Sequence, residues 1–145
     1  MTERDIELDA AVGRDGGHDL EAQLGIDEAR GAGAAAQRAH RQRATAGAIE
    51  KVRINPVTLE PRFRAIGIDM WSDEPGFSEA VQDTPVTGVC GSGIIEVIAE
   101  MYLAGIISQD GVIQGSLVEK TPRVVSDERT FSYLLYENGD TTLFI

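Results

Sequence analysis

The chain has 145 residues and a formal net charge of −11. This length suffices for one domain with a hydrophobic core. The negative charge argues against a surface that binds nucleic acid or an anionic membrane. No run reaches the ~18 apolar residues of a membrane-spanning helix, and the amino terminus lacks the apolar segment of a signal peptide. The expected location is therefore a reducing cytoplasm.

A single cysteine, Cys90, limits the cofactor chemistry of the chain. One thiol cannot form an intrachain disulfide, and one Cys with two His cannot ligate an iron–sulfur cluster or a structural zinc ion. Both histidines, His18 and His40, precede residue 46. Cys90 is therefore expected to be a small buried residue and not a nucleophile, because no His follows that could act as its base.

The composition of the chain changes near residue 46. Residues 31–46 contain no large apolar side chain and are rich in Ala, Arg, Gly and Gln, so they have little to bury. The run GAGAAA at Gly31 resembles a dinucleotide-binding fingerprint, but no strand precedes it and no apolar helix follows it. We expect residues 1–46 to be a poorly ordered or unrelated segment, in which residues 19–30 have the pattern of a short helix. Residues 47–145 are expected to form the domain.

The domain is predicted to open with a β-hairpin. AIEKVRI and RFRAIGI have the residues of two strands, although the alternation in the first is irregular, and NPVTLEP between them supplies a seven-residue turn with Pro56. Phe63 and Ala65 share one face of the second strand. The polar stretch DMWSDEPGFSEAVQDTP follows, and its Trp71 and Phe77 are expected to pack back over the core.

The spacing of apolar residues becomes helical from Ser92 onward. It predicts one amphipathic helix at about 92–104, with Ser92 as the N-cap and Gly105 just beyond the end. The predicted core-facing residues are Ile94, Ile98 and Met101, with Glu96 and Glu100 on the opposite, solvated face.

A second hairpin is predicted at the carboxy end. FSYLLYENGDTTLFI places Asn138-Gly139 between two β-rich runs, which is a strong hairpin signal. The second run reaches Ile145 without a closing turn, so the chain is expected to be truncated there. Its last strand would then be an unprotected apolar edge, and we expect self-association through that edge.

The turn that precedes the predicted helix, TGVCGSG, has two possible interpretations. Backbone N–H groups at a Gly-rich helix start can hold a phosphate with the help of the helix dipole. CGSG nevertheless lacks the Lys and Ser/Thr of a P-loop, and Gly-Ser before a helix is common without any ligand. The residues alone favour a tight turn with a cap, and a phosphate site remains the alternative.

Three segments resemble one protein family. They are VTGVCGSGIIEVIAEMYLAGIISQDGVI, QRATAGAIEKVRINPVTLEPRFRAIG before it and RTFSYLLYENGD after it. They are similar to the carboxy-terminal domain of reductive activators of corrinoid proteins, from about Gln42 to Ile145, and GVCGSGIIE is quite specific to that family. The resemblance implies a fold of the α+β or α/β class, namely a partial actin/sugar-kinase/Hsp70-like (ASKHA) lobe with β-hairpins, one main helix and a flexible amino-terminal segment.

The resemblance also implies a function for the parent protein. In such activators ATP with Mg²⁺ drives the reduction of Co(II) to Co(I) corrinoid on a corrinoid protein of a methyltransferase system. The electron comes from a [2Fe-2S] domain whose ligands this chain lacks. Gly91, Ser92 and Gly93 become the candidate nucleotide-binding residues; no catalytic or metal-binding residue is identified.

Two departures from the family pattern bear on the activity of this chain. IDEARGAGAAAQRAHR stands where the family has a Gly-rich segment of the ATP lobe, and the segment that contacts adenosine has no counterpart here. We therefore expect this chain alone to be inactive and to bind ATP weakly or not at all. The alternative is a non-catalytic remnant or interaction module without nucleotide binding.

Overall fold

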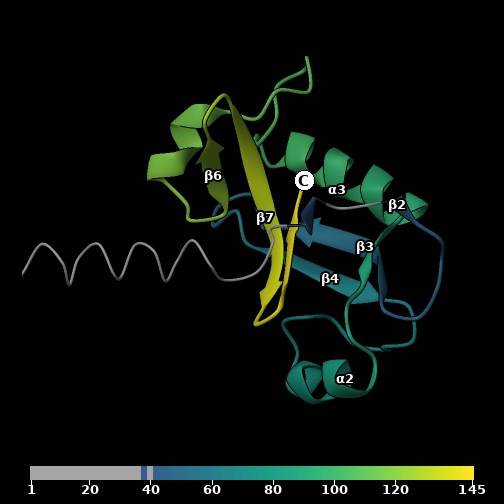
Figure 1. Cartoon of the computed structure of the whole chain (residues 1–145). Coiled ribbons are helices and arrows are strands. Elements are labelled where there is room, and N and C mark those ends of the chain that lie inside the picture. Colours follow the sequence, from purple (N-terminus) through teal and green to yellow (C-terminus); the bar gives the residue numbers. More distant parts are fainter. Residues whose placement is uncertain (1–36, 39–40) are drawn as a thin grey trace, which may run out of the picture. The chain divides into compact units, whose positions relative to one another are not determined.

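The computed structural model describes residues 37–38 and 41–145, with side chains from residue 42 onward (Figure 1). The predicted helix at 19–30 and the flexible amino-terminal segment lie outside these residues. No helix in the described part is long and apolar enough to cross a membrane. The elements in chain order are β1 (Gln37–Arg38), β2 (Arg41–Gln42), β3 (Ala48–Ile54), β4 (Pro61–Ala65), α2 (Phe77–Asp83), β5 (Gly88–Cys90), α3 (Gly91–Leu103), the 3₁₀-helix η1 (Gly115–Glu119), β6 (Val124–Asp127), β7 (Thr130–Asn138) and β8 (Thr141–Phe144).

Two small mixed sheets form the framework. The first has the strand order β2-β5-β3-β4 and the second the order β1-β8-β7-β6. In the first sheet β5 runs parallel to β2 and β3, while β4 returns antiparallel to β3. In the second sheet β1 is parallel to β8, and the other pairs are antiparallel. The expected mixed α+β class is confirmed.

The first predicted hairpin is confirmed as β3–β4. Val52 pairs with Phe63, and Ile54 pairs with Pro61. A register shift between Ile49 and Lys51 marks a β-bulge. Because an extra residue reverses the side on which later side chains point, the bulge explains the irregular alternation of AIEKVRI. Phe63 and the neighbouring Ala65 are buried, as the sequence predicts.

Residues 69–85 contain a short helix, α2, that the sequence pattern did not predict. Phe77 begins this helix and is buried, with its ring 5.5 Å from that of Phe63 in an edge-to-face arrangement. Trp71 is half-buried, and the Arg62 guanidinium lies 4.8 Å from its ring centroid. The packing of Phe77 onto the core is therefore confirmed, whereas Trp71 contacts a surface arginine.

The predicted main helix is α3, and its predicted end is confirmed. Gly105 has a φ of +74°. Its N–H donates to the carbonyl of Tyr102 at 3.0 Å, and the N–H of Ile106 donates to the carbonyl of Met101 at 2.8 Å. This is the Schellman arrangement, which glycine permits because the left-handed region costs it little.

The face that α3 turns to the core differs from the predicted one. Val97 and Met101 are buried, whereas Ile98 is 42% exposed and Ile95 is 73% exposed. The prediction for Met101 is confirmed, and the prediction for Ile98 is wrong. Ile94 is half-buried and packs against the core from its margin. Apolar residues occur on both sides of this helix, so helical spacing alone cannot identify the buried side.

The second predicted hairpin is confirmed as β7–β8, in which Asn138 pairs with Thr141 across Gly139 and Asp140. The expectation that β8 is a free edge is wrong. β1 pairs with it in parallel, with Gln37 opposite Leu143 and Arg38 opposite Phe144. A two-residue polar strand gives almost no sequence signal, so this pairing could not be predicted.

The strands β1 and β2 bear on the division near residue 46. Both precede that residue, and both pair with strands of the two sheets. Residues 34–145 also form one compact unit. The separate character of residues 1–46 stays a prediction, since most of that segment lies outside the described residues.

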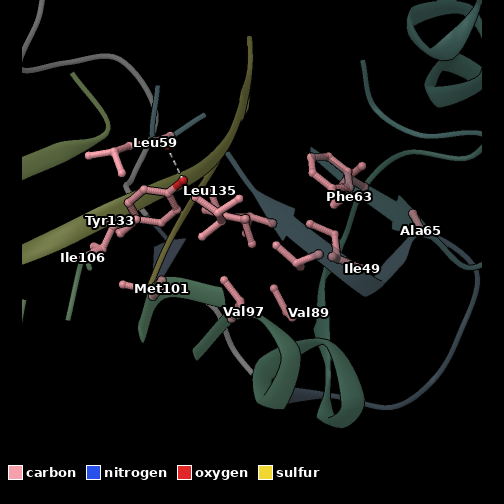
Figure 2. Packing of buried hydrophobic residues seen from close by; sticks show 14 of the residues in the cluster. Ile49, Leu59, Phe63, Ala65, Val89, Val97, Met101, Ile106, Tyr133 and Leu135 are labelled. Carbon is pink, nitrogen blue, oxygen red and sulfur yellow. Dashed lines mark hydrogen bonds between the residues drawn. The ribbon is translucent and has the colours of Figure 1, made fainter. Parts of the chain in front are cut away.

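One buried cluster joins the two sheets (Figure 2). Tyr133 of β7 is fully buried, and its hydroxyl donates to the backbone carbonyl of Leu59 at 2.8 Å. Leu59 lies in the β3–β4 loop with a φ of +61°, which is uncommon for a residue other than glycine. Burial raises the pKa of Tyr133 well above its ordinary value, an effect that nearby Arg123 opposes and Glu60 reinforces.

Candidate functional site

The candidate turn lies where β5 passes directly into α3. Cys90 is the N-cap, with extended backbone angles and no side-chain hydrogen bond to the first turn. Ser92 lies inside the helix, so its predicted role as N-cap is wrong. Its Oγ lies 3.1 Å from the Sγ of Cys90. The N–H groups of the first turn therefore have no side-chain cap, which is a feature that an anion site requires but does not by itself establish.

Gly93 is a packing residue in this turn. It is buried, and a Cβ atom at this position would lie 2.2 Å from the carbonyl oxygen of Ile49 and 2.8 Å from Cγ1 of Val89. No side chain fits at such distances, so glycine allows α3 to approach the backbone of β3. Of the three candidate residues, Ser92 is exposed, Gly91 is half-buried and Gly93 is turned toward the sheet.

Cys90 is buried, as the sequence analysis expects of a small packing residue. Among the described residues, its Sγ contacts the Ser92 hydroxyl, as stated above. Within residues 42–145, no group of three His, Cys, Asp or Glu side chains is arranged to hold a metal ion.

Glu96 and Glu100 have a role that the sequence analysis missed. The Oε2 of Glu96 accepts a hydrogen bond from the backbone N–H of Val52 at 2.9 Å. The Oε2 of Glu100 accepts one from the N–H of Ile54, also at 2.9 Å. Arg53 lies between these two donors on β3 and forms an ion pair with Glu96 at 3.0 Å. The two carboxylates therefore bind the strand and do not form the solvated face that was predicted.

These contacts take the place of strand pairing along one edge of β3. β5 pairs with β3 only at Ala48 and Ile49, so the N–H groups farther along this edge of β3 need other acceptors. Residues i and i+4 of a helix are separated by about 6 Å along its axis. Residues i and i+2 of a strand are separated by about 6.6 Å. The spacing Glu96–Glu100 thus matches the spacing Val52–Ile54. The recognisable signal is the sequence GIIEVIAEM, which places Gly93, Glu96, Val97, Glu100 and Met101 on one helix face.

A cavity of about 710 Å³ lies away from the candidate turn, between the β3–β4 hairpin and β7. Three arginines line it, and each is within ion-pair distance of a carboxylate: Arg53 with Glu96 at 3.0 Å, Arg62 with Asp73 at 3.8 Å and Arg123 with Glu60 at 2.7 Å. These arginines are partly neutralised, so the cavity is not an evident phosphate pocket.

A second cavity of about 650 Å³ is mainly apolar and includes Ile94, Val112 and Phe131 among its lining residues. Gly91, Ser92 and Gly93 line neither of the two cavities.

The two sheets, with α3 following a Gly-rich turn and packed on β3, define a partial domain of the ASKHA type. A family model described as the carboxy-terminal ASKHA domain of RACo matches residues 32–143. The chain belongs to this family. No curated protein sequence matches it. A solved structure named reductive activator for corrinoid, iron-sulfur protein is 26% identical, with a TM-score of 0.52. The match covers 72% of this chain and 14% of the solved chain, so the present chain spans about a seventh of that relative.

Proposed function

We propose that this chain is part of an ATP-dependent reductive activator of corrinoid proteins. The family match over residues 32–143 carries the proposal. The name of the solved relative supports a corrinoid protein as the partner. In the proposed reaction one electron reduces Co(II) to Co(I) corrinoid in a cytoplasmic methyltransferase system. The reaction is proposed for the longer protein, because the chain corresponds to only 14% of the solved relative.

The proposed electron source lies outside this chain. A [2Fe-2S] cluster usually needs four protein ligands, most often cysteine thiolates. The sequence has one cysteine, Cys90, and it is buried between β5 and α3. A separate [2Fe-2S] domain or protein would therefore deliver the electron.

The proposed nucleotide contact is the turn formed by Gly91, Ser92 and Gly93. ATP with Mg²⁺ would supply the driving force when it is bound. The first turn of α3 has no side-chain cap, so its N–H groups fit a phosphate oxygen. In this proposal Gly91 and Ser92 present N–H groups, while Gly93 keeps the helix against β3.

The alternative function is an interaction or packing module that does not bind nucleotide. The contact of Gly93 with Ile49 favours it, because this glycine has a sufficient reason to be present without any ligand. The position of the turn outside both cavities favours it as well. The two functions differ in one measurable property, which is the affinity for ATP.

Calorimetric titration with ATP and Mg²⁺ tests the proposal. The chain of 145 residues is expected to show no micromolar binding, since too few contacts remain to offset the entropy lost on association. A version extended with the remaining ASKHA segments of the relatives is expected to bind. Micromolar binding by the short chain would contradict its proposed incompleteness.

In the extended version, Gly91→Pro tests the turn itself. Gly91 is the first residue of α3, where proline is well accepted, and the preceding Cys90 is already extended as proline requires. The substitution removes one N–H, whereas the control Gly91→Ala retains it. A loss of about tenfold or more in ATP affinity for Gly91→Pro alone would support the phosphate contact. Equal affinity of both variants would assign the turn to helix initiation only.

A further inference from the structure

The outer face of α3 carries no charge. The two carboxylates of this helix, Glu96 and Glu100, both accept hydrogen bonds from β3, which leaves the solvent side without a residue that is charged at neutral pH. An ordinary surface helix shows the reverse distribution, with its charged residues outward. The exposed residues of this outer face are Ser92, Ile95, Ile98, Ala99, Tyr102 and Leu103.

The apolar residues on the outer face are large and well exposed. Ile95 is 73% exposed, Tyr102 is 53% exposed and Leu103 is 74% exposed. Together with Ile98 they leave a patch on the order of 500 Å², which is within the size of the largest apolar patch on a typical monomer, a patch that is often functional. Two such patches bury on the order of 1,000 Å² in total, which is the lower limit for a specific protein–protein contact.

We propose that this face docks a second copy of the chain, through an antiparallel contact between the α3 helices about a two-fold axis. The chain has a net charge of −11, so two copies repel each other over most of their surface. The uncharged face of α3 is where they can meet without desolvating a carboxylate. A copy of the chain offers the same uncharged face, and a two-fold contact uses identical patches on both partners.

The small side chain of Ala99 lies at the middle of the outer face, between Ile95 and Leu103. In an antiparallel pair centred there, each Ile95 packs near the partner's Leu103, and the two Ala99 residues meet at the axis. Small residues at the crossing point let two helices approach to about 8–10 Å. The antiparallel arrangement also places opposite ends of the two helix dipoles together.

Sedimentation velocity from about 10 µM to about 1 mM protein tests the proposal. A reversible monomer–dimer equilibrium is expected, and the dimer fraction should rise with added salt, since salt screens the repulsion between two anionic chains and does not weaken an apolar contact. A chain that stays monomeric over this range at high salt overturns the proposal and would leave the face to another occupant, either the remaining segments of the longer protein or a different protein.

Ile95→Glu is the decisive variant, with Val57→Glu as its matched control. Both positions are exposed and apolar, and both changes add one negative charge, but Val57 lies in the β3–β4 loop and is 88% exposed. Ile95→Glu is expected to raise the dimer dissociation constant about tenfold or more, because it buries an unpaired charge. Val57→Glu should change it little. Equal effects of the two variants would overturn the assignment to α3.

Cross-linking tests the antiparallel geometry independently. The native cysteine is buried, so an introduced thiol is the reactive one under mild oxidation. Ala99→Cys is expected to give a disulfide-linked dimer, because the two Cα atoms at the axis come within the about 4.4–6.8 Å that a disulfide spans. Val57→Cys should remain largely unlinked. Failure of Ala99→Cys to cross-link faster than Val57→Cys would refute the proposed contact.

Discussion

Gly93 shows how a single residue can determine the position of an element. Its sequence context, a Gly-rich turn before a helix, suggests a ligand site. The contact with the Ile49 carbonyl gives the same glycine a structural role. A substitution of Gly93 therefore changes packing whether or not a nucleotide binds, and only changes at Gly91 or Ser92 can separate the two roles.

Gly93→Ala is expected to destabilise the chain by about 1–3 kcal/mol, although alanine favours a helix by about 1 kcal/mol over glycine. The added methyl group would lie 2.2 Å from a backbone oxygen, so α3 or β3 must move. The free energy of unfolding in urea measures this effect. Ser92→Ala, an exposed neighbour, serves as the control and should stay within about 0.5 kcal/mol of the parent. An unchanged stability for Gly93→Ala would show that the close contact is absent.

At the scale of elements, the sequence predicts which segments form structure better than it predicts which face they bury. Both hairpins and α3 follow from turn residues and apolar spacing. The buried side of α3 does not, because Ile95 and Ile98 are as apolar as Val97 and Met101. Glu96 and Glu100, on the same face as Val97, decide the orientation, because they supply the acceptors that the edge of β3 lacks. The strands β1 and β2 escaped prediction because two polar residues carry no periodic signal.

The two faces of α3 should respond differently to truncation. Met101→Ala is expected to cost about 2–5 kcal/mol as a buried large-to-small change. Ile98→Ala should cost less than about 1 kcal/mol, since this side chain is 42% exposed. Glu96→Ala is expected to cost about 1–3 kcal/mol, because the buried N–H of Val52 loses its acceptor. Urea unfolding of the three variants checks the order, and a larger loss for Ile98→Ala than for Met101→Ala would reverse our assignment of the faces.

At the scale of the whole described unit, the two sheets depend on each other. The Tyr133 hydroxyl of the second sheet donates to the Leu59 carbonyl of the first, and the rings of Tyr136 and Phe63 meet at 5.3 Å. One continuous cluster of buried residues spans both sheets. We infer that the sheets unfold together, since neither can separate without exposing this shared core.

Tyr133 makes this interdependence sensitive to alkaline pH. Tyrosine in an unfolded chain has a pKa of about 10. Burial raises the pKa of Tyr133 in the folded chain above this value. Above pH 10 the unfolded chain releases the proton while the folded chain retains it. The stabilisation is therefore complete below pH 10 and is lost as the pH rises toward the folded pKa, at a rate of up to about 1.4 kcal/mol per pH unit.

Urea unfolding at a series of pH values from about 8 to about 11 measures this loss. The parent chain is expected to lose stability progressively above pH 10, whereas Tyr133→Phe should be less stable at pH 8 and show a weaker dependence above pH 10. Tyr102→Phe, which removes an exposed hydroxyl from α3, is the matched control and should follow the parent. The fluorescence of Trp71, the single tryptophan, reports on the first sheet, while Tyr133 belongs to the second. If the Trp71 transition did not shift with pH while the far-ultraviolet circular dichroism transition did, the two sheets would be unfolding separately. A parallel pH dependence for Tyr133→Phe and the parent would show that ionisation of this hydroxyl does not govern the alkaline limit of the fold.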